Sequence, residues 1–347
     1  MSYLNTDVPE LKGYDTGTVL GNIELLEART ETAMEAVLCE LSELAEAIIR
    51  DASGDPDTVF SILLSLRGQQ GEEEDPPLRN ANLLYQSLPP LRGMTKHLGL
   101  HERLFLYHLI LKKLPALPVW GDHREIPSLP SDAQGRIAYM AGSLANKAYM
   151  RFSDHIPGCR AAIFHSFADA CEEVRSGLCQ YCILPLESSS EGKLMGFFKL
   201  MLKYSLQIIA VCDVKVTGGV SEKVTRMGLL RLATGENKAL LSPIVGDTPS
   251  DRYLELLHVT AVPSYSEIMA AADFCGLSLR RTDTIPTESA HFLRSKDPWN
   301  ADIASTSTLP LFSGIWEVSS AHLEVFLLFL TLEAPENPML GLYPSVS

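Results

Sequence analysis

The chain has 347 residues, of which 46% are hydrophobic and 21% charged, and its formal net charge is −14. This length allows two or three modules that each bury a core. The acidic balance disfavours nucleic acid and anionic membrane surfaces as partners, because both require a basic face.

The first residues contain no basic segment followed by an apolar one, so no signal peptide is predicted. The longest apolar run, Val325 to Leu332, is too short to span a bilayer. We therefore expect a cytoplasmic protein without a membrane partner.

Residues 1–115 are predicted to form an all-helical domain. Apolar residues recur at three- and four-residue spacing from Val19 to Arg50, and Gly54 to Pro56 ends that helix. Further helices are expected over Thr58–Leu66, Arg79–Leu88 and His101–Leu114. Prolines at 115, 118, 127 and 130 then mark residues 116–134 as a linker.

Residues 135–245 show short apolar strands that alternate with helices. The expected strands are Arg136–Met140, Ala161–Phe164, Tyr181–Leu186 and Gln207–Val216. The expected helices are Ser143–Phe152, Ser166–Ser176 and Lys193–Lys203. This alternation is typical of an α/β fold with a doubly wound parallel sheet.

Residues 250–347 follow a β-α-β-β-(α)-β order. The segments that carry it are Leu254–Thr260, Tyr265–Cys275, Ser278–Thr284, Phe312–Val318 and Val325–Glu333. Such an order is typical of a small α+β domain of ferredoxin-like type.

Cysteines and histidines give no sign of a metal site. Seven scattered cysteines indicate reduced thiols rather than a disulfide framework. Cys179 and Cys182 form a CxxC beside a predicted strand, whereas a redox pair needs a helix start, so we expect two buried apolar side chains. His97 and His101 lie across a turn at Gly99, and no HExxH pair or glycine-rich nucleotide loop is present. No metal and no cofactor are predicted.

Several short motifs follow one another along the chain, among them Pro-Leu-Glu-Ser-Ser-Ser-Glu-Gly at residues 185–192 and Thr225-Arg226-Met227. The first resembles the P-I-E-N-S-T-E-G motif of prephenate dehydratases, and the second resembles the T-R-F motif of the same family. Residues 166–177 resemble the helix before the first motif, and residues 138–148 resemble the family's opening segment. The closing Leu340–Pro344 resembles the L-G-S-Y-P ending of the regulatory ACT module.

The resemblance implies one lobe of a dehydratase, of the periplasmic-binding-protein type, over residues 135–245 and an ACT-like domain over residues 250–347. The family's reaction is the decarboxylative dehydration of prephenate to phenylpyruvate, which would make the chain a carbon–oxygen lyase. Thr225 stands at the position of the catalytic threonine, and Arg226 would hold a substrate carboxylate. The other predicted substrate-binding residues are Ser143, Glu187, Ser188, Ser189, Ser190 and Lys193, and Lys147 would add positive charge.

The serine-rich turn has two interpretations. If Ser188 to Ser190 opens a helix, its hydroxyl and backbone N–H groups would face a bound anion. The structural alternative is a capping box, with Ser188 as the N-cap and Glu191 three residues later.

The chain departs from the family at several places. Only eight residues separate Val216 from Thr225, where the family inserts its second lobe, so half of the substrate cleft is expected to be missing. The ACT positions Ser264–Ser266 and Asp283–Pro286 lack the glycine and the arginine of the phenylalanine-binding motifs. The N-terminal helices resemble a chorismate mutase at residues 79–84 and 97–100, but most of the cations that a mutase requires are absent, so mutase activity is not expected.

Two functional hypotheses therefore stay open. The first is a prephenate dehydratase-like lyase of aromatic amino acid metabolism, with a small anionic substrate. The second is a degenerate or repurposed relative that acts on another anionic substrate, or that binds a ligand or a partner protein. In both, the ACT-like domain predicts a homodimer.

Overall fold

The protein is described from a computed structural model of residues 1–347. The structure describes residues 16–67, 98–114, 117, 134–156, 158–216, 223–233, 252–259, 263–285, 311–318, 322–334, 337 and 339–346. The predicted helix Arg79–Leu88, nearly all of the predicted linker and the predicted boundary at residues 245–250 lie outside these ranges.

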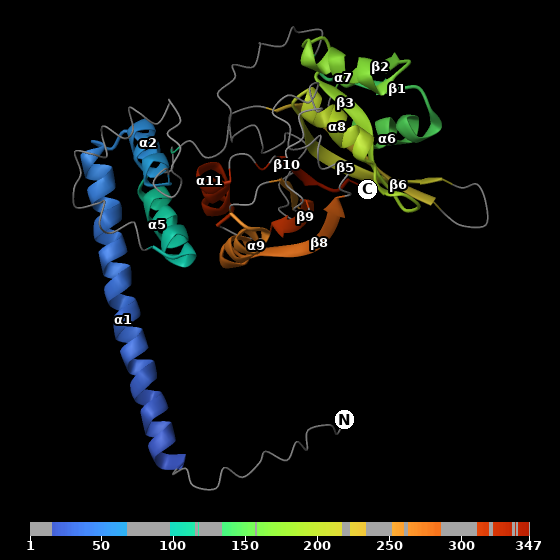
Figure 1. The fold of residues 1–347 in the computed structure, drawn as a ribbon. Coiled ribbons are helices and arrows are strands. Elements are labelled where there is room, and N and C mark those ends of the chain that lie inside the picture. The colour runs from blue at the N-terminus through green and yellow to red at the C-terminus, as the bar shows by residue number, and fades with distance from the viewer. Residues whose placement is uncertain are drawn as a thin grey trace, which may run out of the picture.

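Among the described residues of the N-terminal part there are three helices: α1 (Thr16–Asp51), α2 (Pro56–Arg67) and α5 (Leu100–Lys113). They coincide with the predicted helices over Val19–Arg50, Thr58–Leu66 and His101–Leu114 to within a few residues. The C-terminal part of α1 buries Leu41, Leu44 and Ile48 against α2 and α5. Residues 32–39 of α1 are all exposed, and Figure 1 shows the helix projecting away from the rest of the protein.

The remaining chain builds one mixed sheet with the strand order β2-β1-β3-β6-β5-β10-β7-β9-β8, and the short β4 pairs with β3 (Figure 1). The strands are β1 Arg136–Met140, β2 Arg160–Phe164, β3 Tyr181–Ser188, β4 Gly192–Lys193, β5 Leu206–Val216, β6 Lys223–Leu232, β7 Arg252–His258, β8 Leu277–Ile285, β9 Leu311–Val318 and β10 Met339–Pro344. The helices of this part are α6 Ser143–Ser153, α7 Phe167–Arg175, α8 Met195–Lys203, α9 Tyr265–Phe274 and α11 Leu323–Glu333.

The four strands predicted for a parallel sheet, β1, β2, β3 and β5, run in the same direction, but β6 lies antiparallel between β3 and β5, which makes the sheet mixed. Strand β1 runs parallel to β2 and β3, whereas β6 runs antiparallel to both β3 and β5. Residues 217–222 alone separate β5 from β6, and a parallel crossover needs about a dozen residues or more, so the two strands must form a hairpin.

The C-terminal part has the order β7-α9-β8-β9-α11-β10, which agrees with the predicted β-α-β-β-(α)-β order except at Val325–Glu333, where the prediction of a final strand is wrong. The segment Val325–Glu333 belongs to the second helix, and β10 is the last strand. Helix α9 begins with a capping box, in which Ser264 and Glu267 satisfy each other's backbone N–H groups.

Strand β10 joins the two halves of the sheet. It pairs antiparallel with β7 and parallel with β5, where Gly341 lies opposite Ile208. Beyond its end, the Val346 N–H donates to the carbonyl oxygen of Val211 at 2.7 Å. A Cβ atom at Gly341 would collide with the carbonyl oxygen of Ile208, so this close approach requires glycine.

Helices cover both faces of the sheet. Helix α6 packs over one face of β3, β5 and β6, and α7 and α8 pack over the other. Helices α9 and α11 cover β7, β9 and β10, and the N-terminal helices pack against them in the same core. In the core under α7 and α8, Cys179 and Cys182 are fully buried, as predicted.

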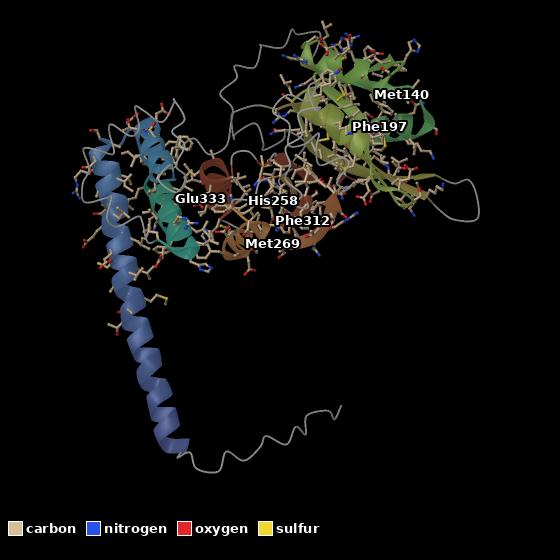
Figure 2. All side chains as sticks on the ribbon, in the orientation of Figure 1. Met140, Phe197, His258, Met269, Phe312 and Glu333 are labelled. Atoms are coloured by element: carbon tan, nitrogen blue, oxygen red, sulfur yellow. The ribbon has the colours of Figure 1, made fainter. Side chains whose placement is uncertain are left out.

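An ion pair fastens the N-terminal helices to the C-terminal part. Arg103 of α5 donates from Nε to Glu333 Oε1 at the end of α11 over 2.9 Å, and the Tyr107 hydroxyl donates to the same oxygen over 2.8 Å. Figure 2 labels Glu333 at this junction. Among the described residues, no helix has both the length and the apolar character needed to cross a membrane.

Candidate functional site

The predicted site residues divide between the two faces of the sheet. Thr225 and Arg226 are consecutive in β6, and consecutive side chains of a strand point to opposite faces. Thr225 lies opposite Val214, which belongs to the core under α6. Arg226 lies opposite Glu187 and Asp213 on the α8 side. The expectation that Thr225 and Arg226 face one shared ligand is therefore wrong for this chain.

The α6 face holds the predicted hydroxyl groups. Thr225 is 8% exposed and is paired with Ser188 of β3. Above them, Lys147 of α6 donates to the carbonyl oxygen of Lys215 over 3.3 Å. Ser143, the exposed first residue of α6, lies one turn before Lys147 on the same helix face. This face therefore combines hydroxyls with one lysine.

The serine-rich turn does not open a helix. Ser188 ends β3, the chain reverses through Gly192 at φ +72°, and β4 pairs back onto β3. Helix α8 starts later, at Met195, with Leu194 as its N-cap and no side-chain cap. Both the anion-binding helix start and the capping box are thus corrected to a β-hairpin turn.

The hydroxyl groups of this turn serve the turn itself. The Ser188 and Ser190 hydroxyls lie 2.9 Å apart, and the Ser189 hydroxyl accepts the Val224 N–H over 3.1 Å. The Ser189 N–H in turn donates to the Val224 carbonyl over 2.9 Å. The turn is thereby fixed to the start of β6.

On the opposite face, predicted site residues meet side chains from the C-terminal strands. We call Lys193, Arg226, Glu255, Ser313 and Tyr343 the Glu255 cluster. The Lys193 ammonium forms an ion pair with the Glu255 carboxylate and donates to Ser313 Oγ over 2.9 Å. The Tyr343 hydroxyl donates to Glu255 Oε2 over 2.6 Å, and the Arg226 guanidinium carbon lies 5.8 Å from the centroid of the Tyr343 ring.

Glu255 carries its charge although it is only 3% exposed. Burial alone would raise the pKa of the Glu255 carboxyl, but the charge and hydrogen bond of Lys193, the Tyr343 hydroxyl and Arg226 together lower it. Burial and the neighbouring carboxylate of Glu255 raise the pKa of Tyr343 well above its usual value, so the phenol stays a donor. The core of the cluster is a buried ion pair, whose carboxylate also accepts from Tyr343 and whose ammonium also donates to Ser313.

A second group of ion pairs adjoins the cluster. Glu187 of β3 pairs with Arg281 of β8, and Arg281 Nη2 lies 2.8 Å from Asp283 Oδ1. Asp283 Oδ2 lies 3.8 Å from Lys193 Nζ, which links the two groups. Three cations (Lys193, Arg226 and Arg281) therefore face three carboxylates (Glu187, Glu255 and Asp283), and the combined site has no excess of positive charge.

Sequence reasoning named Glu187, Lys193 and Arg226 but not their partners. Glu255 had a visible signal, since it is the one acid within the apolar run Leu254-Glu255-Leu256-Leu257. An acid at such a position needs a buried partner. Which residue provides that partner follows from strand order and cannot be derived from the local pattern.

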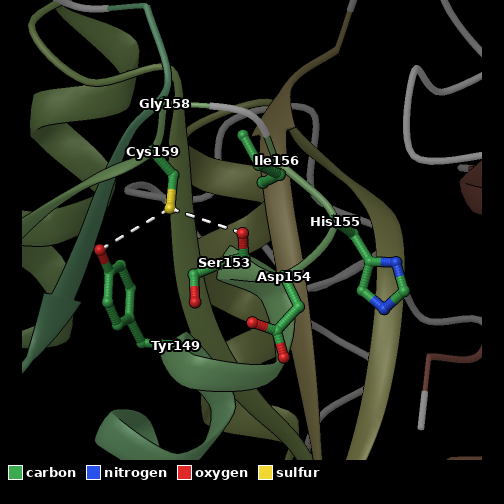
Figure 3. Close-up of a pocket in the computed structure, with 7 residues that line it drawn as sticks. All are labelled: Tyr149, Ser153, Asp154, His155, Ile156, Gly158 and Cys159. Atoms are coloured by element: carbon green, nitrogen blue, oxygen red, sulfur yellow. Dashed lines mark hydrogen bonds between the residues drawn. The ribbon is translucent and has the colours of Figure 1, made fainter.

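A hollow of about 470 Å3 lies away from all of these residues, at the end of α6 (Figure 3). In it, the Cys159 sulfur lies 3.8 Å from the Tyr149 hydroxyl and 3.8 Å from the Ser153 carbonyl oxygen. Within the described ranges, no three His, Cys, Asp or Glu side chains are arranged to hold a metal ion.

No family model matches the chain, and no curated protein sequence matches it. Among solved structures, it is similar to prephenate dehydratase from Streptococcus mutans, with 18% identity over 61% of this chain and 99% of that one, at a TM-score of 0.43. It is also similar to GqqA, described as a novel type of quorum quenching acylase, with 15% identity over 61% and 95% of the two chains and a TM-score of 0.40. A third is prephenate dehydratase from Arthrobacter aurescens in complex with L-Phe, with 12% identity over 60% and 90% and a TM-score of 0.39. At these identities and TM-scores, none of the three assigns an activity to this chain.

Proposed function

We propose that this chain is a prephenate dehydratase-like protein that has lost the dehydratase reaction and acts in aromatic amino acid metabolism by binding a ligand or a partner protein. One observation carries the proposal. The Glu255 carboxylate is buried against Lys193 and close to Arg226, the two cations that the motif resemblance assigns to the substrate.

The charge balance explains why catalysis is not expected. Prephenate is a dianion, and its binding requires cations that the protein does not already neutralise. Here each of the three cations has a carboxylate of the chain beside it. A substrate carboxylate would have to displace Glu255 and leave that buried charge without its partner, which is costly.

The placement of Thr225 supports the same conclusion. A hydroxyl that protonates the departing group must lie within hydrogen-bond reach of the bound substrate. Thr225 points to the α6 face, whereas the cations gather on the α8 face. The sheet itself separates the two.

One observation favours lyase activity as a second candidate. Thr225 and Ser188 lie opposite each other on the face where α6 brings Lys147, so two hydroxyls and the Lys147 ammonium share that side. A substrate that binds there would not need the Glu255 cluster.

Phenylpyruvate formation from prephenate at neutral pH distinguishes the two candidates. Three proteins are compared: the wild type, Thr225→Val, which removes the hydroxyl at nearly constant volume, and Thr225→Ser, which keeps it. We expect all three to match the rate without protein. If the wild type and Thr225→Ser form phenylpyruvate and Thr225→Val does not, the proposal is contradicted and the lyase activity is established.

A binding assay tests the positive half of the proposal. Thermal unfolding is followed with prephenate, chorismate or phenylalanine, because a ligand that binds only the folded state raises the midpoint. A concentration-dependent rise with one of the three, without turnover, is the expected result for a binding protein of this metabolism.

A further inference from the structure

A small hollow lies where α5 meets α9 and α11, and its lining shares no residue with the Glu255 cluster. It measures about 180 Å3 and is lined by Phe105, His108, Phe274, His322 and Val325. From this lining we propose a binding site for a small aromatic carboxylate at the junction between the N-terminal helices and the C-terminal part. The proposal is independent of the function proposed above.

The apolar walls fit one aromatic ring. Val325 is buried, Phe105 is partly buried, and Phe274 is 40% exposed. An exposed phenyl ring beside a hollow provides apolar surface that a bound ring would cover. An apolar cavity of about 150 Å3 is known to accept benzene, so this hollow has room for one six-membered ring with a short substituent.

Two imidazoles form the polar side. The ring centroids of His108 and His322 lie 5.0 Å apart, with the ring planes at 84°. Burial, followed by the charges of His322 and Lys112, lowers the pKa of His108, so its ring is uncharged at neutral pH. A carboxylate beside the rings would accept an imidazole N–H, and a hydrogen bond to a charged acceptor is stronger than one to a neutral acceptor.

The walls are held in place before any ligand binds. Helices α5 and α11 run past each other, with Arg103 bonded to Glu333 at one end and His108 against His322 at the other. On the α9 side, the ring of Phe274 lies 5.6 Å from that of His101, which also belongs to α5. Because these contacts fix the separation of the three helices, little ordering entropy is lost on binding.

The lining also determines which acid fits. Its described residues include two imidazoles and no carboxylate, so none of these residues pairs with an ammonium group. An aromatic acid without an amino group is therefore the expected ligand class. Phenylacetate represents it, phenylacetamide is its uncharged isostere, and phenylalanine adds the ammonium group.

Titration of the full chain with phenylacetate, by calorimetry and by NMR of the histidine rings, tests the site. We expect saturable binding in the millimolar range, as for a ligand of this size. The ring signals of His108 and His322 should shift, and those of the exposed His165 should not. Phenylacetamide should bind about tenfold more weakly, the equivalent of one charge-assisted hydrogen bond. Phenylalanine should also bind more weakly than phenylacetate, because its ammonium group would lose water without gaining a carboxylate partner.

Variants locate the binding energy. Phe274→Leu changes an exposed side chain and should weaken binding without loss of folding, and His108→Gln keeps polarity but removes the imidazole. His165→Ala is the control and should bind as the wild type does. Unsaturable binding, equal affinity for phenylacetamide, or an equal loss in the control would each overturn the proposal.

Discussion

Replacement of Glu255 by Gln perturbs the centre of the Glu255 cluster while it keeps the shape of the side chain. The Lys193 side chain is 8% exposed, so the variant leaves an ammonium group buried beside an uncharged amide. Removal of one partner of a buried ion pair costs about 3–5 kcal/mol. With about 2.1 cal/mol/K of unfolding entropy per residue, 347 residues give roughly 0.7 kcal/mol/K. If the chain unfolds as one unit, Tm should fall by about 4–7 °C.

Glu317→Gln provides a matched control on a neighbouring strand. Glu317 of β9 pairs with Arg280 of β8, whose side chain is 57% exposed. Exposed ion pairs contribute about 0–1 kcal/mol, so this variant should lose about 1 °C or less on the same entropy basis. Thermal unfolding by circular dichroism, at one protein concentration and one ionic strength, measures both variants.

The pH dependence of stability tests the contribution of the Glu255 carboxylate independently. The pKa of Glu255 lies below the ordinary value of 4.5 in the folded state, because Lys193 outweighs burial together with the other donors. Its contribution to stability is thus present above about 4.5 and is lost as pH falls through the lower folded pKa. The difference in Tm between the wild type and Glu255→Gln should be constant near neutral pH and should become smaller as the pH falls below about 4.5.

Two results would refute this reasoning. The first is an equal loss of Tm for Glu255→Gln and Glu317→Gln. The second comes from the double variant Glu255→Gln/Lys193→Met, which removes both charges and should recover part of the loss. Strict additivity of the two single changes would show that the pair does not interact.

Two further predictions concern the joins between parts of the chain. Gly341→Ala places a methyl against the carbonyl oxygen of Ile208, so we expect the free energy of unfolding to fall by about 1–3 kcal/mol and amide exchange in β10 to become faster. Gly142→Ala is the control, because no atom lies within 4 Å of the added methyl, and it should change stability little. Arg103→Met leaves the Glu333 carboxylate, 12% exposed, without its cation. We expect the free energy of unfolding to fall by about 1–3 kcal/mol and hydrogen exchange in α5 to become faster. Unchanged exchange in α5 would show that the ion pair does not hold the helix.

Apolar periodicity predicted most of the described helices and strands, because it reports which side of each segment is buried. Helix α6, for example, was expected over Ser143–Phe152 and spans Ser143–Ser153. The alternation of side chains within a strand also places Thr225 and Arg226 on opposite faces of the sheet. The motif match alone led to the expectation that both residues contact one ligand.

The site was harder to predict for two physical reasons. Ser188 and Glu191 satisfy the spacing of a capping box, but Gly192 adopts a left-handed conformation that turns the chain back into β4. A capping pattern does not exclude a hairpin that competes with it. The partners of Glu255 are remote as well, because Lys193 lies 62 residues before it and Tyr343 lies 88 residues after it.

Strand β10 also has a consequence for biosynthesis. Residues 339–344 form the last strand in the chain, so they leave the ribosome after all the other strands of the sheet. Until then, β5 and β7 each present an open row of backbone donors and acceptors, which invites pairing with other nascent chains. Translation arrest or proteolysis just upstream of residue 339 would leave two half-sheets with exposed edges, and such fragments should depend on chaperones far more than the completed protein does.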